Sequence, residues 1–379
     1  MSDRVQVVPL GRTPRDVTRF LNVSYTVYQR DPKWVAPLLM DLKKVFTCQN
    51  PFFEHAEMQL WVAVNSGRDV GRIAAIEDRS FNARQPIPTA YFGFFESLEA
   101  TEISDALFHA ASRWARERGL QRILGPMNPS GNDECGLLVQ GFEAAPVFMM
   151  PYNPRYYINL VERAGFQKSK DLVAFDIDLK QTPMQRLERV AARFAKRQFD
   201  IQFRPVRRKT LHADLAKVKE IYNEAWDDNW GFVPMTDGEI DFMAERLKPM
   251  LAEGLVWLAE TDHQPVGFLL ALPDFNEALK PLRGRLLGAG LFRFLPYLLR
   301  WKTPATVRVV VLGVKEAYRN RGIESVMLVE GLRTGFRLGF TGCEASWILE
   351  DNVSVRRVIE LFGGKPYKIY RIYERTVGH

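Results

Sequence analysis

Two stretches of the chain share one pattern of apolar and polar positions. Around Trp61, and again around Trp257, a short apolar run ends in a polar turn and is followed by a second apolar run. Such paired runs predict a β-hairpin. In both stretches an Ala lies two residues after the Trp, and a Val-Gly pair ends at Gly71 and Gly267, at the same distance from the Trp.

Two further pairs of similar segments follow at nearly the same offset. Trp34 and Trp230 each follow a helical pattern and precede a Pro, and the segment 160–165 resembles the segment 358–363. The alternative is coincidence among common residues, but four matches at one spacing favour duplication. We therefore predict two copies of one unit, joined near residues 180–205.

The same order of elements is predicted in each copy. The first copy has strands at 5–10, 58–64, 70–77, 89–96, 121–125 and 172–178, and helices at 15–29, 102–118 and 155–164. The second has a hairpin at 255–272, strands at 307–314, 343–349 and 367–373, and helices at 213–225, 322–338 and 353–361. A connecting helix is expected at 182–198. This order predicts an α/β fold with mixed sheets flanked by helices, in domains 1–180 and 206–379 with a helical connector at 181–205.

The composition limits the class of protein. Of 379 residues, 46% are hydrophobic and 26% charged, which is typical of a globular chain. Cys48, Cys135 and Cys343 form no CxxC pair, so a disulfide scaffold, a Cys-rich zinc site or any other metal site is not expected, and a reducing cytoplasm is. The N-terminus lacks a signal-peptide pattern, and no apolar run approaches the roughly 20 residues of a membrane span. We expect a soluble or peripheral protein.

A strand, loop and helix around Gly322 form a candidate anion site. The predicted strand ends near Val314, and the loop before the next helix carries Arg319, Arg321 and Gly322. Helix N-terminal amides attract anions, and a glycine lets the backbone approach a ligand closely. The alternative is an ordinary β–α turn with solvated arginines, and the spacing alone leaves both open.

The loop resembles the coenzyme A pyrophosphate loop of the GNAT acyltransferase superfamily. The resemblance implies acyl-CoA as a cosubstrate, with no permanently bound cofactor, held by residues Val314, Arg319, Arg321, Gly322 and Asn352. Asn352 would contact the pantetheine arm or start a helix. Two positions depart from the pattern: Glu324 replaces the usual Gly or Ala, and Ile359 stands where a Tyr often protonates the leaving thiolate.

The first copy matches the fold pattern without the loop. Between the predicted strand 89–96 and the helix from residue 102 there is no Arg-x-x-Gly. We therefore expect acyl-CoA to bind only in the second copy, and the first copy to be a degenerate partner that shapes the acceptor pocket.

Six longer strings resemble a family of bacterial double-GNAT proteins that includes the bacterial ceramide synthases. They are the segments 50–57, 125–130, 132–138, 150–154, 229–234 and 346–352. The resemblance implies an N-acyltransferase that moves a long-chain fatty acyl group from acyl-CoA to the amine of a sphingoid base or its 3-oxo form. The alternatives are an N-acyltransferase for a small amine or amino acid, and a non-catalytic acyl-CoA-binding membrane adaptor.

Residues 278–303 are a basic and apolar insertion between two strands of the second copy. They hold six Lys and Arg and no acidic residue, interleaved with Leu, Phe, Tyr and Trp. This composition is typical of an element at an anionic membrane surface. It also contributes most of the net charge of +7, so no nucleic-acid partner is needed to explain the charge. The alternative is internal packing with arginines reaching outward. We expect a cytoplasmic protein, peripheral on the inner membrane.

Amide formation needs a base for the amine and stabilisation of an oxyanion. Glu350, at a strand end beside the expected thioester, is the first candidate base; its alternative is a capping role beside Asp351. His55, beside Glu54, is the second candidate, although a lone His is more often structural. Cys135 is interpreted as a packed thiol rather than a nucleophile, because no His partner is evident.

Polar residues in Gly- and Pro-bound segments are candidates for acceptor binding. The substrate-binding candidates are Asn128, Asn132, Asp133, Tyr152 and Trp230. The sequence favours core or pocket wall for Trp226 and Trp230 over any catalytic part.

Overall fold

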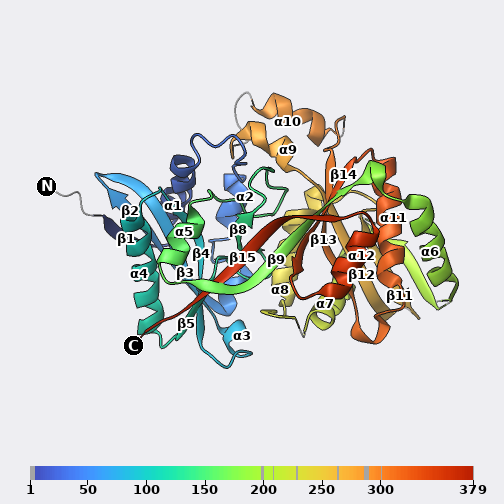
Figure 1. The fold of residues 1–379 in the computed structure, drawn as a ribbon, viewed down its shortest axis with the longest axis horizontal. Coiled ribbons are helices and arrows are strands. Elements are labelled where there is room, and N and C mark those ends of the chain that lie inside the picture. The colour runs from blue at the N-terminus through green and yellow to red at the C-terminus, as the bar shows by residue number, and fades with distance from the viewer. Residues whose placement is uncertain are drawn as a thin grey trace. The chain divides into compact units, whose positions relative to one another are not determined.

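The computed structural model describes residues 5–197, 200–207, 209–227, 229–262, 264–285, 290–299 and 301–378. Helices flank mixed sheets (Figure 1), which confirms the predicted α/β class. The chain forms two compact units. Unit 1 contains residues 1–172, 279–291 and 368–379, and unit 2 contains residues 173–278 and 292–367. The domain boundaries at 1–180 and 206–379 stay a prediction.

Unit 1 is built around the sheet β1-β2-β3-β4-β5-β15. Its elements are β1 (Gln6–Leu10), α1 (Pro14–Val27), α2 (Leu39–Lys44), η1 (Pro51–Glu54), β2 (Ala56–Asn65), β3 (Arg68–Asp78), α3 (Arg79–Asn82), β4 (Thr89–Ser97), α4 (Thr101–Glu117), β5 (Arg122–Gly125), β6 (Met127–Asn128), β7 (Glu134–Cys135), β8 (Leu137–Gln140), α5 (Tyr157–Arg163), the start of β9 (Gln167–Asp178) and most of β15 (Lys365–Thr376). Only β4 and β5 pair in parallel among these neighbours.

Unit 2 repeats this order of elements. After the end of β9 come η2 (Leu179–Gln181), α6 (Met184–Arg197), β10 (Ile201–Pro205), α7 (Leu211–Ala225), α8 (Asp237–Leu247), η3 (Lys248–Met250), β11 (Val256–Thr261), β12 (Gln264–Pro273), α9 (Asn276–Leu279), η4 (Lys280–Leu282), α10 (Gly290–Leu298), β13 (Thr306–Val314), η5 (Glu316–Tyr318), α11 (Ile323–Arg337), β14 (Gly342–Leu349) and α12 (Val353–Leu361). Of these, η4 and the first two residues of α10 belong to unit 1. The sheet runs β9-β14-β13-β12-β11-β10, with only β13 and β14 parallel among the printed pairs. The sequence reading missed β10 and α8.

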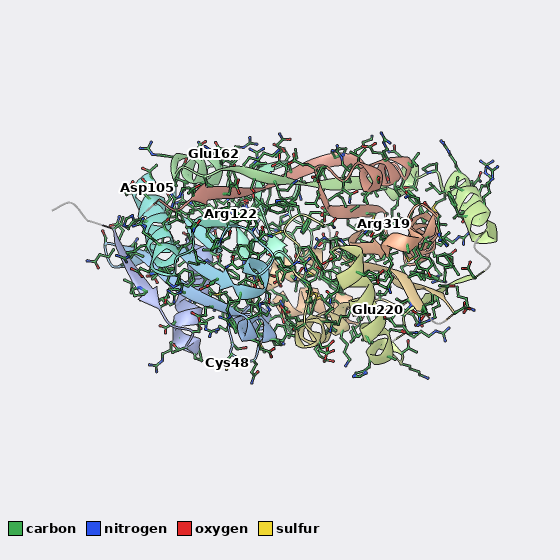
Figure 2. The ribbon with its side chains drawn as sticks, turned by 90° about the horizontal axis from the view of Figure 1, so that it is seen from below. Cys48, Asp105, Arg122, Glu162, Glu220 and Arg319 are labelled. Carbon is green, nitrogen blue, oxygen red and sulfur yellow. The ribbon has the colours of Figure 1, made fainter. Side chains whose placement is uncertain are left out.

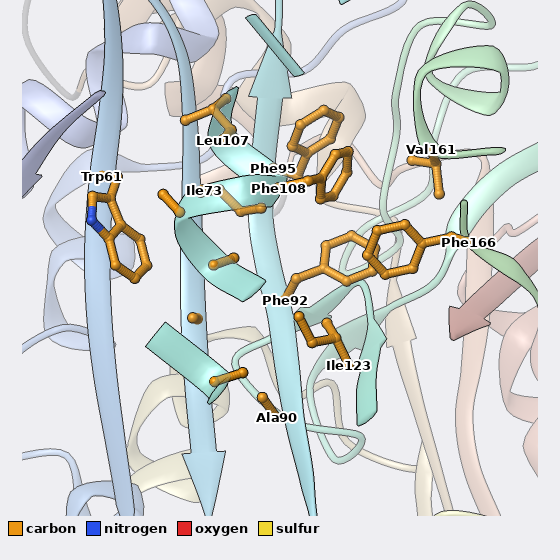
Figure 3. Close-up of a cluster of buried hydrophobic side chains, with 14 of the residues drawn as sticks. Trp61, Ile73, Ala90, Phe92, Phe95, Leu107, Phe108, Ile123, Val161 and Phe166 are labelled. Carbon is orange, nitrogen blue, oxygen red and sulfur yellow. The ribbon is translucent and has the colours of Figure 1, made fainter. Parts of the chain in front are cut away.

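The apolar face of α4 packs on the sheet of unit 1 through aromatic side chains. Phe108 of α4 stacks on Phe95 with ring centroids 4.7 Å apart and meets Phe92 edge-on at 5.4 Å, beside Phe166 (Figure 3). The helix pattern fits this contact, because the buried residues of α4 recur at helical spacing while the opposite side is charged.

The sheet of unit 2 is covered on both faces. Residues Val307, Cys343 and Ala345 face a core shared with α6, α11 and α12, whereas Phe268 faces the side of α7. Because side chains alternate along a strand, Arg308 and Glu344 point to the α7 side. This assignment matters for the site, since both of these polar residues are buried.

A kink in β4 receives a short strand that lies directly against it. The register with β3 shifts between Arg72 and Ala74, and Phe94 has a φ of 50°. Asn128 on β6 accepts a hydrogen bond from the Phe94 amide at 2.6 Å. A Cβ on Gly93 would lie 1.7 Å from the Met127 carbonyl oxygen, so only glycine permits this approach.

We expect Gly93→Ala to lower the free energy of unfolding by about 3 kcal/mol, the upper end of the usual overpacking cost, because the added methyl group meets backbone. Urea titration followed by circular dichroism measures it. Gly335→Ala in α11 is the matched control, since its Cβ meets only Phe340 at 3.9 Å and alanine favours a helix. Equal stability of the two variants would contradict the close approach.

Candidate functional site

Two parallel strands of unit 2 separate next to the predicted anion loop. β13 and β14 pair from Thr306–Gly342 to Val309–Ala345, and both strands then run on without further pairing to each other. At the same place along β13, its pairing with the neighbouring strand β12 also shifts register, between the partners of Leu270 and Ala271. The carboxyl ends of the two strands are therefore splayed. The GNAT resemblance places the thioester in such a splay.

In unit 1 the equivalent place is filled by the chain itself. β4 and β5 pair only from Thr89–Arg122 to Tyr91–Leu124, and β6 lies against β4 immediately beyond. Asn128, a candidate for acceptor binding, instead caps the kinked strand. The filled space favours a donor site in unit 2 over one in unit 1.

Arg319 is held by backbone groups of unit 2. Figure 2 labels this side chain in unit 2. Its Nη2 donates to the Ala225 carbonyl at 2.7 Å and its Nε to the Val314 carbonyl at 3.4 Å, so it links the end of α7 to the end of β13. The carbonyls at the end of a helix attract a cation, which accounts for the contact with Ala225, and the Arg319 side chain is otherwise exposed to solvent. Arg321 lies over the Tyr318 ring at 5.0 Å.

An aromatic ring covers the glycine of the loop. Gly322 precedes α11 with a φ of 79°, and a Cβ there would lie 2.3 Å from the ring of Phe194 on α6. Val314, also expected to contact acyl-CoA, is buried in the core beside this loop. Burial raises the pKa of Glu324 in the first turn of α11, and the charge of Arg319 opposes this shift. As an anion site the loop is thus closed by Phe194.

The loop between β14 and α12 contains two of the candidate residues, Glu350 and Asn352. Asn352 accepts a hydrogen bond from the Val355 amide at 3.2 Å and begins α12, which is the helix-starting role in the resemblance. Glu350 is half-buried just after β14, and its backbone carbonyl accepts a bond from Arg356 at 2.9 Å. This position leaves the candidate base at the end of the splayed strand.

His55 lies in unit 1 with a carboxylate partner. Its Nδ1 is 3.0 Å from the Asp78 carboxylate, which also accepts bonds from the Ser80 and Phe81 amides and begins α3. Phe52 packs edge-on against the imidazole. His55 belongs to unit 1, whereas Glu350 belongs to unit 2.

The remaining candidates of unit 1 take part in local contacts. The Ser130 hydroxyl donates to Asp133 at 2.8 Å and accepts from the Asn132 amide at 3.2 Å. Tyr152 donates to Asp31 at 2.7 Å, and burial with this carboxylate raises its pKa. Cys135 is buried, as expected for a packed thiol.

Two tryptophans of unit 2 follow α7. The Trp226 ring occupies the space over Gly313 on the splayed part of β13 and packs against Phe268 and Tyr222. It is a wall on the α7 side of the strand, as expected. Trp230 is partly buried in the turn that follows.

The sequence reading missed a buried polar cluster at the base of the splay, consisting of Arg308, Glu344, Ser346 and Tyr367. The Ser346 hydroxyl donates to Glu344 and accepts from Arg308 Nε at 2.9 Å. Arg308 Nη2 also donates to the Ser346 carbonyl at 3.2 Å, and the Tyr367 hydroxyl donates to Glu344. The available signal was alternation: Glu344 and Ser346 share one face of an otherwise apolar strand.

Two properties of the described residues bear on membrane and metal binding. None of their helices has the length and apolar character needed to span a bilayer. Within the same residues, no group of three or more His, Cys, Asp and Glu side chains is arranged to hold a metal ion.

No protein-family model matches the chain. The chain is 34% identical to "Bacterial ceramide synthase" of Caulobacter vibrioides over 98% of both chains. It is 33% identical to "Protein YghO" of Escherichia coli over 100% of this chain and 98% of that protein.

Solved structures share the fold at low sequence identity. A tandem GNAT protein from the clavulanic acid biosynthesis pathway is 13% identical, with a TM-score of 0.60 and 99% of both chains covered. A GCN5-related N-acetyltransferase from Sphaerobacter thermophilus is also 13% identical, with a TM-score of 0.53 and 100% and 98% covered. The chain therefore has the tandem GNAT fold and belongs to the family of the bacterial ceramide synthase of Caulobacter vibrioides and YghO of Escherichia coli.

Proposed function

We propose that the protein transfers a long-chain fatty acyl group from acyl-CoA to the amine of a sphingoid base or its 3-oxo form, giving a ceramide-type amide. The observation that carries the proposal is the 34% identity, over the full length, to a bacterial ceramide synthase. The GNAT fold and the splayed β13–β14 pair support an acyl thioester as donor. In the reaction the amine nitrogen bonds to the thioester carbonyl carbon, the carbon–sulfur bond breaks, and the thiol leaves.

In this proposal unit 2 binds the donor. Arg321, the amides that begin α11 and Gly322 receive the pyrophosphate, and Arg319 fixes the shape of the loop through Val314 and Ala225. Phe194 must then leave the space beside Gly322. Acceptor binding remains a prediction for Asn128, Asn132, Asp133, Tyr152 and Trp230. The observed hydrogen bonds of Asn128 with the Phe94 amide and of the Asn132 amide with Ser130 give these two residues a structural role.

A lipid acceptor agrees with an exposed apolar surface on α10. The helix and the residues after it expose Phe292 and Trp301, each 78% accessible, together with Leu291, Leu295 and Leu299. The three leucines are four residues apart and so share one face. Before the helix, the Arg283 carbonyl accepts a bond from Tyr25, and the Leu39 amide donates to Gly284. This exposure favours an anionic membrane surface over internal packing.

A non-catalytic acyl-CoA-binding adaptor is the second candidate. Ile359, at the position where a Tyr often protonates the leaving thiolate, favours it, because binding without turnover needs no acid there. Release of free thiol from palmitoyl-CoA in the presence of sphinganine distinguishes the two. Turnover with small amines alone would favour the other enzyme alternative.

We expect Glu350→Gln to lower turnover about 10²–10⁴-fold with little change in acyl-CoA affinity, the usual effect of losing a general base. His55→Ala is measured beside it at equal folded content, with thiol release as the assay. If Glu350→Gln keeps near wild-type turnover while His55→Ala loses it, His55 and not Glu350 is the general base.

Removing the ring at position 194 should open the loop. We expect Phe194→Ala to bind coenzyme A several-fold more tightly, and Arg321→Ala about tenfold or more weakly, because a charge-assisted phosphate contact is worth about 1.5–3 kcal/mol. Titration calorimetry measures both. Leu187→Ala, on the same helix, controls for a loosened α6. Unchanged affinity in Phe194→Ala and Arg321→Ala would move the donor site away from Gly322.

The α10 surface should bind anionic vesicles. We expect wild type to co-sediment with phosphatidylglycerol liposomes, less so as salt rises, because each basic residue near the surface contributes about 1 kcal/mol. Changing Arg283, Arg285 and Arg293 to Gln, or Phe292 and Trp301 to Ser, should release it; Arg300 lies outside the described residues. Met40→Ser, at another exposed apolar side chain, is the control. Unaltered sedimentation of both variants would refute this surface.

A further inference from the structure

Amide formation from an ammonium and a thioester moves two protons. The first leaves the ammonium before attack and goes to solvent through the base. The second is on nitrogen after attack and must leave it, while the departing thiolate gains a proton. The position where related proteins often have a Tyr for this thiolate is Ile359, a buried apolar residue of α12. A second group is therefore required.

The buried cluster at the base of the splay has the composition for that transfer. Arg308 and Glu344 lie opposite each other in the β13–β14 register, one residue pair before the last pair of the two strands. Both point to the α7 side of the sheet, which is also where Trp226 covers Gly313. Arg308 and Glu344 thus lie where the strands begin to separate, next to the space that the proposed reaction assigns to the thioester, and Tyr367 reaches Glu344 from β15.

The hydrogen bonds have a single direction. Ser346 and Tyr367 both donate to the carboxylate of Glu344, and Arg308 donates to Ser346. The Glu344 carboxylate thus accepts from two hydroxyl groups, and the guanidinium of Arg308 lies beside Ser346. The hydroxyl of Tyr367 is the donor that links the cluster to β15.

Tyr367 is the least buried residue of the cluster. Glu344, Ser346 and Arg308 are 1%, 2% and 4% accessible, whereas Tyr367 is only partly buried. A buried charge that served packing alone would cost free energy that apolar residues avoid. The arrangement instead leads from a partly buried phenol to an interior carboxylate.

We propose that Tyr367 and Glu344 form a proton relay for the acyl transfer; this inference rests on the proposed function. The phenol oxygen of Tyr367 accepts the proton of the attacking nitrogen as its own proton passes to Glu344. When the carbon–sulfur bond breaks, Glu344 returns that proton to Tyr367, which gives its proton to the thiolate sulfur. Both residues end as they began, and the products are amide and thiol. Ser346 and Arg308 are positioning residues.

The test uses the full chain with palmitoyl-CoA and sphinganine, followed by thiol release and by mass spectrometry of the amide. Tyr367→Phe and Glu344→Gln are each expected to lower kcat about 10²–10⁴-fold, with KM for palmitoyl-CoA within threefold. The double variant should be no slower than either single variant, because the two residues act as one unit.

Tyr373→Phe is the matched control. Tyr373 lies on the same strand, and its hydroxyl donates to the Glu162 carboxylate at 3.0 Å in unit 1, so the change removes the same kind of bond. Its kcat should stay within threefold of wild type, with a similar change in Tm. Ser346→Ala, expected to lower kcat about tenfold, serves if Tyr367→Phe fails to fold.

A change of leaving group separates proton transfer from structural support. With a palmitoyl thioester of an acidic aromatic thiol, which leaves without protonation, the defect of Tyr367→Phe should shrink to less than tenfold. A defect of the same size with both donors, or a kcat within threefold of wild type with palmitoyl-CoA, overturns the relay. Wild type that releases no thiol with any amine overturns the proposed function itself, and the relay with it.

Discussion

The structure of each unit depends on where the pairing of two parallel strands stops. In a continuous sheet the backbone groups of neighbouring strands satisfy one another, and no ligand can enter between them. In unit 2, pairing of β13 and β14 ends at Val309 and Ala345 while both strands continue, and the kink against β12 falls at the same level. The unpaired strand ends need other partners, and a thioester arm is one chemical solution.

Unit 1 solves the same problem with its own backbone. Its parallel pair ends after three residues, and β6 enters beside β4 so closely that residue 93 has to be glycine. The Phe94 amide, which is exposed by the kink, is satisfied by the side chain of Asn128. Duplication therefore produced one unit whose splay is closed by its own chain and one whose splay is lined by side chains. The distinction agrees with the absence of an Arg-x-x-Gly loop from the first copy.

Periodicity predicted the fold well because the strands and helices of both units bury one regular face each. The helix at 102–118 and the strands at 89–96 and 307–314 lie within a residue or two of their observed bounds. The strand β10 was missed because its short run of Ile201–Pro205 follows an Arg-rich helix and carries Gln202 and Arg204 between its apolar residues. Chemistry was harder to predict, since the partners of Glu344 come from three strands and meet only in the fold. Likewise, nothing in the Arg319–Gly322 loop reveals that Phe194, far away in sequence, occupies the space beside its glycine.

Unit 2 contains two polar clusters, one around Arg204 and one around Glu344, and we assign a structural role to the first and a functional role to the second. Arg204 pairs with Asp214 and Glu260, and Lys217 also pairs with Glu260, so two basic groups face two carboxylates. These partners lower the pKa of both carboxyls against the effect of burial. These groups join β10, β11 and α7, and every one of them has a structural task. The cluster of Glu344 is different, because it lies at the base of the splayed β13–β14 pair and includes the partly buried phenol of Tyr367 on β15. Burying these charged groups costs free energy that apolar side chains at the same places would avoid. In the proposed relay that cost has a functional reason, because Tyr367 and Glu344 carry a proton between the reacting groups.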